Sequence, residues 1–233
     1  MLFRQLFDSE TCTFTYLLAD ERSKEAVLID PVLEQVERDL QLLNELSLRL
    51  KYLIETHIHA DHITGAALLK EKTGAQTVVS RKAGVENANR NVKTGDTISF
   101  GDSHLQVRET PGHTSSCMTL VWEMHGRKIA FTGDALFIRG CGRTDFQEGS
   151  PNTLYKSVHE QIFSLPDDTL IYPGHDYKGH TRSTVAEEKQ FNPRLKLAND
   201  ENAFADIMNG LNLAYPKKID TALPANLRGG LAE

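Results

Sequence analysis

Apolar residues in this chain fall into short runs separated by polar turns, first alone and then alternating with helical patterns. The runs at 12–18 and 25–29 flank a polar turn and predict a hairpin. Apolar positions from 32 to 46 recur at helical spacing after Pro31, which predicts an amphipathic helix. Further strands are expected at 50–55, 76–80, 97–100, 104–109, 118–122, 128–131 and 170–172. Further helices are expected at 63–72, around 154–162, at 183–190 and at 203–208. This order of elements predicts a layered α/β protein.

The length of 233 residues favours one large domain. We expect that domain to span residues 1–190. Residues 191–233 are less regular, with several prolines and the pair Gly229-Gly230, and are expected to form a C-terminal extension packed on the same domain. A chain of this size buries enough surface to fold without a metal or disulfides, so a metal site here would point to function.

Charge and cysteine content narrow the class of protein. The 26 Lys and Arg residues against 32 Asp and Glu residues give a net charge of −6, which is unlike the basic surface of a nucleic-acid binder. The three cysteines, Cys12, Cys117 and Cys141, are odd in number and widely spaced, which favours a reducing compartment. No apolar stretch approaches the roughly 20 residues of a membrane span, and charged residues interrupt the N-terminal stretch. These features predict a cytoplasmic protein without a nucleic-acid or membrane partner.

Metal-competent side chains follow four of the expected strands. Residues 56–62 read T-H-I-H-A-D-H, and the later segments T-P-G-H, T-G-D and Y-P-G-H end in His113, Asp134 and His175. Proline and glycine interrupt a strand and leave the next side chain on a short loop. Loops at the carboxyl ends of strands are where ligands usually bind in α/β sheets. We therefore expect one metal site built from His57, His59, Asp61, His62, His113, Asp134 and His175.

Each of these residues also has a structural explanation when it is taken alone. Asp61 could cap the following helix, Asp134 could be a turn residue, and a single loop histidine is usually not a ligand. Their combination favours metal binding. Residue types leave the number of ions open. The set could hold two ions roughly 3.5–4 Å apart, or His57, His113 and Asp134 could form the two-histidine, one-carboxylate face of non-haem Fe(II) oxygenases. The lack of cysteine pairs disfavours a closed structural zinc site.

With these motifs, the chain from about residue 11 to 180 resembles the metallo-β-lactamase superfamily. The resemblance implies a four-layer αββα sandwich, in which two mixed β-sheets are flanked by helices. Longer stretches are similar to the persulfide dioxygenases: C-T-F-T-Y-L-L-A-D from residue 12, E-A-V-L-I-D-P-V from 25, T-G-D-A-L-F-I-R-G-C-G-R-T-D-F-Q from 132 and L-P-A-N-L-R from 223.

This second resemblance implies an activity and a ligand set. The family oxidises glutathione persulfide with O₂ and water to sulfite and glutathione, using one Fe(II) per chain. The matching iron ligands are His57, His113 and Asp134. The matching positions His59, Asp61, His62 and His175 surround the iron without binding it, although they could instead serve a second metal. A homodimer is compatible with the resemblance.

The resemblance also places the glutathione contacts. The matching residues are Arg143, Tyr177 and Arg194. The fork-shaped guanidinium groups of the two arginines suit the two carboxylates of the tripeptide. Surface salt bridges and a packed ring are the alternative for these three residues. Cys141, two residues before Arg143, could trap sulfur or could be a small buried thiol.

Other functions compete with this interpretation. A glyoxalase-II-like dinuclear zinc hydroxyacylglutathione hydrolase shares the T-H-x-H-x-D-H motif. Those enzymes carry a sizeable helical C-terminal domain, whereas only 58 residues (233 minus 175) follow His175 here, and R-G-C-G-R-T-D-F is not their sequence. A sensor without turnover would not need a complete ligand set. An RNA-processing nuclease would need a basic surface.

Overall fold

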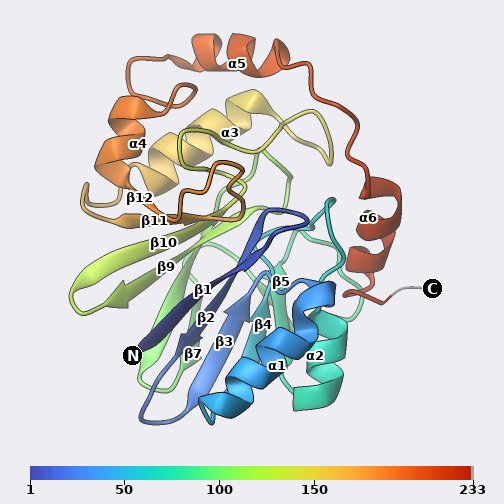
Figure 1. Ribbon diagram of the computed structural model, residues 1–233. Coiled ribbons are helices and arrows are strands. Elements are labelled where there is room, and N and C mark those ends of the chain that lie inside the picture. The colour runs from blue at the N-terminus through green and yellow to red at the C-terminus, as the bar shows by residue number, and fades with distance from the viewer. Residues whose placement is uncertain (232–233) are drawn as a thin grey trace. The chain divides into compact units, whose positions relative to one another are not determined.

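The computed structural model describes residues 1–231, which divide into two compact units (Figure 1). The first unit contains Met1–Val92, Thr97–His104 and the C-terminal stretch from Tyr215, and the second contains Lys93–Asp96 and Leu105–Ala214. Among residues 1–231 no helix is both long and apolar enough to cross a bilayer. The expected boundary between a domain at 1–190 and an extension at 191–233 stays a prediction.

The first unit is built on a mixed sheet with the strand order β1-β2-β3-β4-β5-β6. These strands are β1 (Leu2–Asp8), β2 (Thr13–Ala19), β3 (Glu25–Ile29), β4 (Arg49–Ile54), β5 (Gln76–Ser80) and β6 (Arg90–Val92). The neighbours β1, β2 and β3 pair antiparallel, whereas β3 to β6 pair parallel. Strand β7 (Thr97–Phe100) lies among the residues of this unit but is not a strand of this sheet. Parallel neighbours end at the same edge of a sheet, so the residues after β3 and β4 come close together.

Helices of the first unit pack on this sheet, and those between β3 and β5 supply crossovers between its parallel strands. They are the 3₁₀ turn η1 (Leu33–Gln35), α1 (Val36–Glu45), α2 (Ala66–Thr73) and α6 (Ile219–Leu227). Helices α1 and α2 lie next to each other (Figure 1). Leu43 and Leu69 from these helices pack with Leu17, Leu28 and Leu53 of the sheet in one buried cluster. Burial of that apolar surface is the main term that holds the helices on the sheet.

The second unit holds most of another mixed sheet, in which β12, β11, β10, β9 and β8 follow one another in that order. Its strands are β8 (Ser103–Glu109), β9 (Met118–Met124), β10 (Arg127–Gly133), β11 (Leu170–Pro173) and β12 (Ser183–Thr184). Strands β10 and β11 pair parallel, and the other neighbours pair antiparallel. The helical segments are α3 (Pro151–Ser157), the π-helical turn η2 (Val158–Ile162), α4 (Val185–Phe191) and α5 (Glu201–Asn209). Leu154, Ile162 and Phe204 from these segments join Ala130 and Ile171 in one core.

Most predicted elements are confirmed, and the strands at 25–29, 76–80 and 97–100 have the predicted bounds. The sequence analysis missed β1, β6 and α6. The helix expected at 63–72 begins only at Ala66, with Gly65 at its N-cap position. The interpretation of Asp61 as a helix cap is therefore wrong, and both Asp61 and His62 lie in the irregular segment before the helix. That segment leaves their side chains available for other contacts.

Candidate metal centre

In the first unit, His57 follows strand β4, and its orientation depends on the end of the neighbouring strand β3. Asp30, directly after β3, has a left-handed backbone with φ of +52°. Its carboxylate accepts two hydrogen bonds from Thr56, one from the backbone N–H and one from the hydroxyl, each 2.7 Å long. Thr56 Oγ1 also lies 3.0 Å from His57 Nδ1. The parallel pairing of β3 with β4 thus brings a carboxylate, a hydroxyl and an imidazole into one chain of hydrogen bonds.

This chain of hydrogen bonds determines the tautomer of His57. A carboxylate can only accept, so the Thr56 hydroxyl donates its proton to Asp30. The oxygen of Thr56 is then an acceptor for His57, and Nδ1 of His57 carries the proton. The lone pair of His57 is left on Nε2, which is the atom that would bind a metal. Such partners of a ligating histidine orient the ring and raise its basicity.

The neighbouring histidines of the same loop face carboxylates. His59 Nε2 lies 3.2 Å from Asp30 Oδ1 and 3.4 Å from Glu55 Oε2. Burial opposes a charge on His59, but Asp30 and Glu55 outweigh it, and the pKa of His59 lies well above its usual value. His62 Nδ1 donates to Asp61 Oδ2 at 3.0 Å, and His62 Nε2 is buried without a hydrogen-bond partner among residues 1–231. His59 could hold a metal ion either with Asp61 and His62 or with Asp30 and Glu55.

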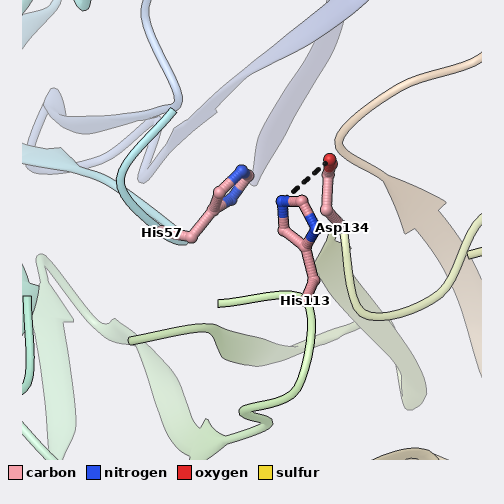
Figure 2. Close-up of side chains that lie close together, drawn as sticks. All are labelled: His57, His113 and Asp134. Atoms are coloured by element: carbon pink, nitrogen blue, oxygen red, sulfur yellow. Dashed lines mark ion pairs between the residues drawn. The ribbon is translucent and has the colours of Figure 1, made fainter. Parts of the chain in front are cut away.

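In the second unit, three of the predicted residues lie together at the ends of β8, β10 and β11. His113 Nε2 lies 3.5 Å from Asp134 Oδ2, the pair joined by the dashed line in Figure 2, which also draws His57. His175 Nδ1 donates to the other oxygen of Asp134, Oδ1, at 2.8 Å. The backbone carbonyl of Arg143 accepts a 2.6 Å hydrogen bond from His113 Nδ1. The carbonyl can only accept, so His113 also keeps its lone pair on Nε2.

Two glycines permit the close approach of these loops. A Cβ atom on Gly142 would lie 2.8 Å from His113 Nδ1, and one on Gly174 would lie 2.6 Å from Asp134 Oδ1. Both distances are below normal van der Waals contact, so any side chain at either position would displace a candidate ligand. The backbone itself is linked here, since Gly142 N–H donates to the carbonyl of Asp134 at 2.8 Å. The glycines of G-C-G-R and Y-P-G-H therefore serve the packing of the candidate ligands.

The pair formed by His113 and Asp134 is suited to a cation. With the proton on Nδ1, the lone pair of His113 Nε2 faces a carboxylate oxygen at 3.5 Å. Two such electron pairs repel each other unless a proton or a metal ion lies between them. Ligands each about 2.1 Å from one ion lie roughly 3–3.5 Å apart, so the observed separation accommodates a metal. An imidazole and a carboxylate are also hard-to-borderline donors, which suit Fe(II) and Zn(II).

The predicted glutathione contacts all lie in the second unit. Arg143 forms a two-pronged ion pair with Asp145, with N···O distances of 2.6 and 2.7 Å, and donates to the carbonyl of Ala214. Arg194 donates to the carbonyl of Cys141 at 3.0 Å. The ring of Tyr177 is 68% exposed and stacks parallel to the His175 ring at 5.9 Å. The salt-bridge alternative thus describes part of what Arg143 does, while Tyr177 presents a ring to solvent beside a candidate metal-site histidine.

The Cys141 thiol is buried in the second unit. Its sulfur lies 3.7 Å from both Met208 Sδ and Arg194 Nη1. Burial raises the pKa of Cys141 to about 11, although Arg194 lowers it in part. A thiol that stays protonated at neutral pH is a poor nucleophile. This environment favours the buried-thiol interpretation of Cys141 over a sulfur trap.

Comparison with known proteins agrees with this fold. Residues 13–175 match the family described as the metallo-beta-lactamase superfamily. The chain belongs to that superfamily, and it has the expected fold of two mixed β-sheets with flanking helices.

Longer similarities place the chain within the superfamily. It is 56% identical to the human protein named "Persulfide dioxygenase ETHE1, mitochondrial" over 232 residues, which cover 99% of this chain and 89% of that one. The crystal structure of ETHE1 from Myxococcus xanthus superposes with a TM-score of 0.95 at 51% identity, covering 99% and 100% of the two chains. The protein is a member of the persulfide dioxygenase family, which confirms the resemblance seen in its motifs.

A hydroxyacylglutathione hydrolase from a Polaromonas species is 37% identical over 179 residues. This match covers 75% of the present chain and 66% of the hydrolase. It is shorter and weaker than the match to the persulfide dioxygenases.

Sequence reasoning missed the residues that orient the candidate ligands. Asp30 and Thr56 were given no role in the site, although an acidic residue directly after the strand at 25–29 and a hydroxyl residue directly before His57 were visible signals. The carbonyl of Arg143 could not have been found, because any residue type supplies a backbone carbonyl. Glu55, buried beside His59, was likewise missed.

Replacing Thr56 by valine tests whether the hydroxyl orients His57. Thr56→Val keeps the branched shape, removes the hydroxyl's hydrogen bond to Asp30 and the acceptor for His57, and leaves the backbone N–H bond to Asp30 in place. We expect Fe(II) affinity to fall about 10- to 100-fold, the usual cost of losing such a partner of a ligand. A competition titration with a chelator would measure this change. Thr56→Ser retains the hydroxyl and should bind Fe(II) like the unchanged protein. Equal affinities for the valine and serine variants would rule out the orienting role.

The pKa of Cys141 leads to a prediction about its chemistry. With a pKa of about 11, roughly one thiol in a thousand is ionised at pH 8. Treatment of the native protein with iodoacetamide at pH 8 should therefore label the half-buried Cys12 well before Cys141, as peptide mass spectrometry would show. Labelling of Cys141 should increase as the pH rises toward 11. Equal labelling of the two cysteines at pH 8 would contradict the buried-thiol interpretation.

Proposed function

We propose that this protein is an iron-dependent persulfide dioxygenase, which oxidises glutathione persulfide with O₂ and water to sulfite and glutathione. The observation that carries this conclusion is 56% identity to a named persulfide dioxygenase along 99% of the chain. A similarity of that length includes every segment that bears a candidate ligand. The dioxygenase activity is therefore inferred from similarity along the whole chain, and not from a shared metal motif alone.

We further propose that His57, His113 and Asp134 hold one Fe(II). Together they supply two imidazoles and one carboxylate, the donor set typical of non-haem iron oxygenases. The hydrogen bonds within each unit support this choice, because Nε2 of both histidines is left as the ligating atom. Asp134 offers Oδ2, while His175 occupies Oδ1. His59, Asp61, His62 and His175 then surround the iron without binding it.

The residues of the chain prepare the site for two ligands. Bound Fe(II) supplies open coordination positions at which O₂ and a sulfur anion can meet. Asp30 acting through Thr56, and the Arg143 carbonyl, hold the two imidazole rings in fixed orientations. His175 holds the carboxylate of Asp134. The rings and the carboxylate thus need little rearrangement when substrate arrives, which is how a rigid site lowers the cost of reaction.

Arg143, Tyr177 and Arg194 are proposed to bind the glutathione part of the substrate. The tripeptide carries two carboxylates, which guanidinium groups recognise through paired hydrogen bonds. Arg143 already makes such a pair with Asp145, so a substrate carboxylate would share or replace that partner. Tyr177 offers an exposed ring next to His175 against which an apolar part of the substrate can pack.

The competing function is a dinuclear zinc hydroxyacylglutathione hydrolase. The partial match to a protein of that name is the observation in its favour, together with the metal-capable group of His59, Asp61 and His62. Two bound zinc ions would use that group. We favour the dioxygenase because its relatives match end to end.

Location and assembly are separate proposals. We propose a cytoplasmic homodimer, on the basis of the cysteine content and the family resemblance. The human, bovine and mouse relatives carry the word mitochondrial in their names, so the compartment has to be determined for this protein itself. Sedimentation analysis and fluorescent tagging address the two points.

Metal content and oxygen consumption, measured on the same purified sample, test the proposed function. We expect about one iron per chain and O₂ uptake that depends on glutathione persulfide, because one facial triad holds one ion. His113→Ala should abolish both iron loading and turnover. Two zinc ions per chain, with thioester cleavage and without O₂ uptake, would instead support the hydrolase. Turnover retained in the alanine variant would remove His113 from the ligand set.

Arg143 can be tested without disturbing the metal ligand beside it. His113 bonds to the backbone carbonyl of Arg143, so Arg143→Ala removes the guanidinium and leaves that hydrogen bond in place. We expect the KM for glutathione persulfide to rise about 10-fold or more while kcat changes little. The reason is that a carboxylate contact stabilises the bound substrate and the transition state equally. Steady-state O₂ uptake over a range of persulfide concentrations measures both constants. An unchanged KM would leave the side chain with its contacts to Asp145 and the Ala214 carbonyl as its role.

A further inference from the structure

The C-terminal helix α6 carries a buried asparagine whose side chain is fully used by the loop of metal-site histidines. Asn226 Nδ2 donates to the backbone carbonyls of His59 and His62, each at 2.9 Å. Its Oδ1 accepts the backbone N–H of Thr64, also at 2.9 Å. The residue is only 3% exposed. One amide therefore binds both ends of the segment from His59 to Thr64, although it lies 162 to 167 positions further along the chain.

The loop needs such a partner because it has no regular secondary structure. Residues 55–65 form neither a strand nor a helix, so the carbonyls of His59 and His62 are not part of a sheet ladder or a helical turn. A buried carbonyl without a partner costs free energy comparable to a lost hydrogen bond. The side chain of Asn226 supplies both donors at once. Asparagine is suited to this task, since its amide has two N–H groups on one side and an acceptor on the other.

Neighbouring residues of α6 hold the asparagine in place. Leu223, one helical turn earlier, packs in a cluster with Ile58 and Val79, and Ile58 lies between His57 and His59 in sequence. After the helix, Gly230 approaches the loop so closely that a Cβ atom there would lie 2.6 Å from the Thr64 carbonyl oxygen. The backbone of Glu86 also donates to the carbonyl of Leu227 at 3.1 Å. Packing and hydrogen bonding thus direct one face of α6 toward the T-H-I-H-A-D-H segment.

From these contacts we propose that Asn226 is a positioning residue for the metal centre. It fixes the backbone of the histidine loop and so fixes the direction in which His57 presents Nε2, without itself touching the metal. The L-P-A-N-L-R segment then has a defined task in the site. This inference rests on the proposed function for the identity of the metal, but its test is a binding measurement that does not need turnover.

Two substitutions separate the role in positioning from a role in global stability. Asn226→Ala removes all three hydrogen bonds. Asn226→Asp keeps the shape and the acceptor for Thr64 but places a carboxylate oxygen against two carbonyls. The matched control is Thr221→Ala, which changes an exposed side chain on the same helix. For each protein we would measure Fe(II) affinity by chelator competition, amide hydrogen exchange of the peptide covering 56–66 in the metal-free state, and the thermal midpoint.

We expect both Asn226 variants to bind Fe(II) about 10- to 100-fold more weakly, the range seen when the support of a metal ligand is removed. Exchange in the 56–66 peptide should become faster while exchange in β2 and β3 stays unchanged, because the lost bonds are local. Thr221→Ala should match the unchanged protein in every measurement. If Asn226→Ala does not fold, the isosteric aspartate variant decides the question.

Unchanged affinity and unchanged exchange in the Asn226 variants would overturn the proposal. So would faster exchange spread evenly through the first unit, or failure of both variants to fold, because each would show a global structural role. Failure of the proposed function would look different. A protein that binds Fe(II) but consumes no O₂ with glutathione persulfide would refute the dioxygenase and still allow the affinity comparison.

Discussion

The candidate metal centre depends on where the protons of two imidazole rings lie. In each unit a histidine of the site has Nδ1 bound to an acceptor, the Thr56 oxygen in one and the Arg143 carbonyl in the other. Without those acceptors either nitrogen could carry the proton, and the rings could rotate. With them, Nε2 is the nitrogen left to bind a cation, and the surrounding loops can be understood as the means of holding these two hydrogen bonds. The same logic extends to Asp134, where His175 engages one oxygen and leaves the other to face His113.

The supports of this arrangement are drawn from different kinds of structure. Parallel strands β3 and β4 bring Asp30 to Thr56, so a feature of sheet topology becomes a feature of the site. In the second unit, the missing side chains of Gly142 and Gly174 let the loops after β10 and β11 approach the candidate ligands. In the first unit, α6 adds an amide to a loop that has no regular hydrogen bonding of its own. Each support acts on the loop backbone or on side-chain atoms other than the candidate ligating atoms. The ligating atoms therefore stay available for a metal ion.

Much of the fold and the candidate ligand set could be predicted from the sequence, for a physical reason. Buried strands such as β4 and β11 are short apolar runs, and candidate ligands, His57 and His175, stand shortly after them. Strand β1 was missed because only one of its seven residues is fully buried, which leaves a weak apolar pattern. Helix α6 was missed because Pro224 lies inside it. Asp61 was considered as the N-cap of the following helix, but Gly65 occupies that position. Local sequence cannot show where an irregular loop ends.

The partners of the ligands were harder to find than the ligands. A histidine in T-H-x-H carries its own signal, whereas the acceptor for His113 is a backbone carbonyl that no residue type marks. Asn226 was visible within L-P-A-N-L-R, but nothing in the sequence alone connects it with a loop more than 160 residues away. Such links arise only from tertiary structure.

The position of Asn226 along the chain also has a consequence for biosynthesis. The histidine loop is translated early, and the amide that completes its hydrogen bonding is translated 162 to 167 residues later. Contacts between such distant segments form slowly and late in folding, because a long loop has to close first. On the growing polypeptide the early histidines therefore lack part of their scaffold until α6 has left the ribosome. The order of synthesis thus delays a finished binding loop until nearly all of the described chain has been made.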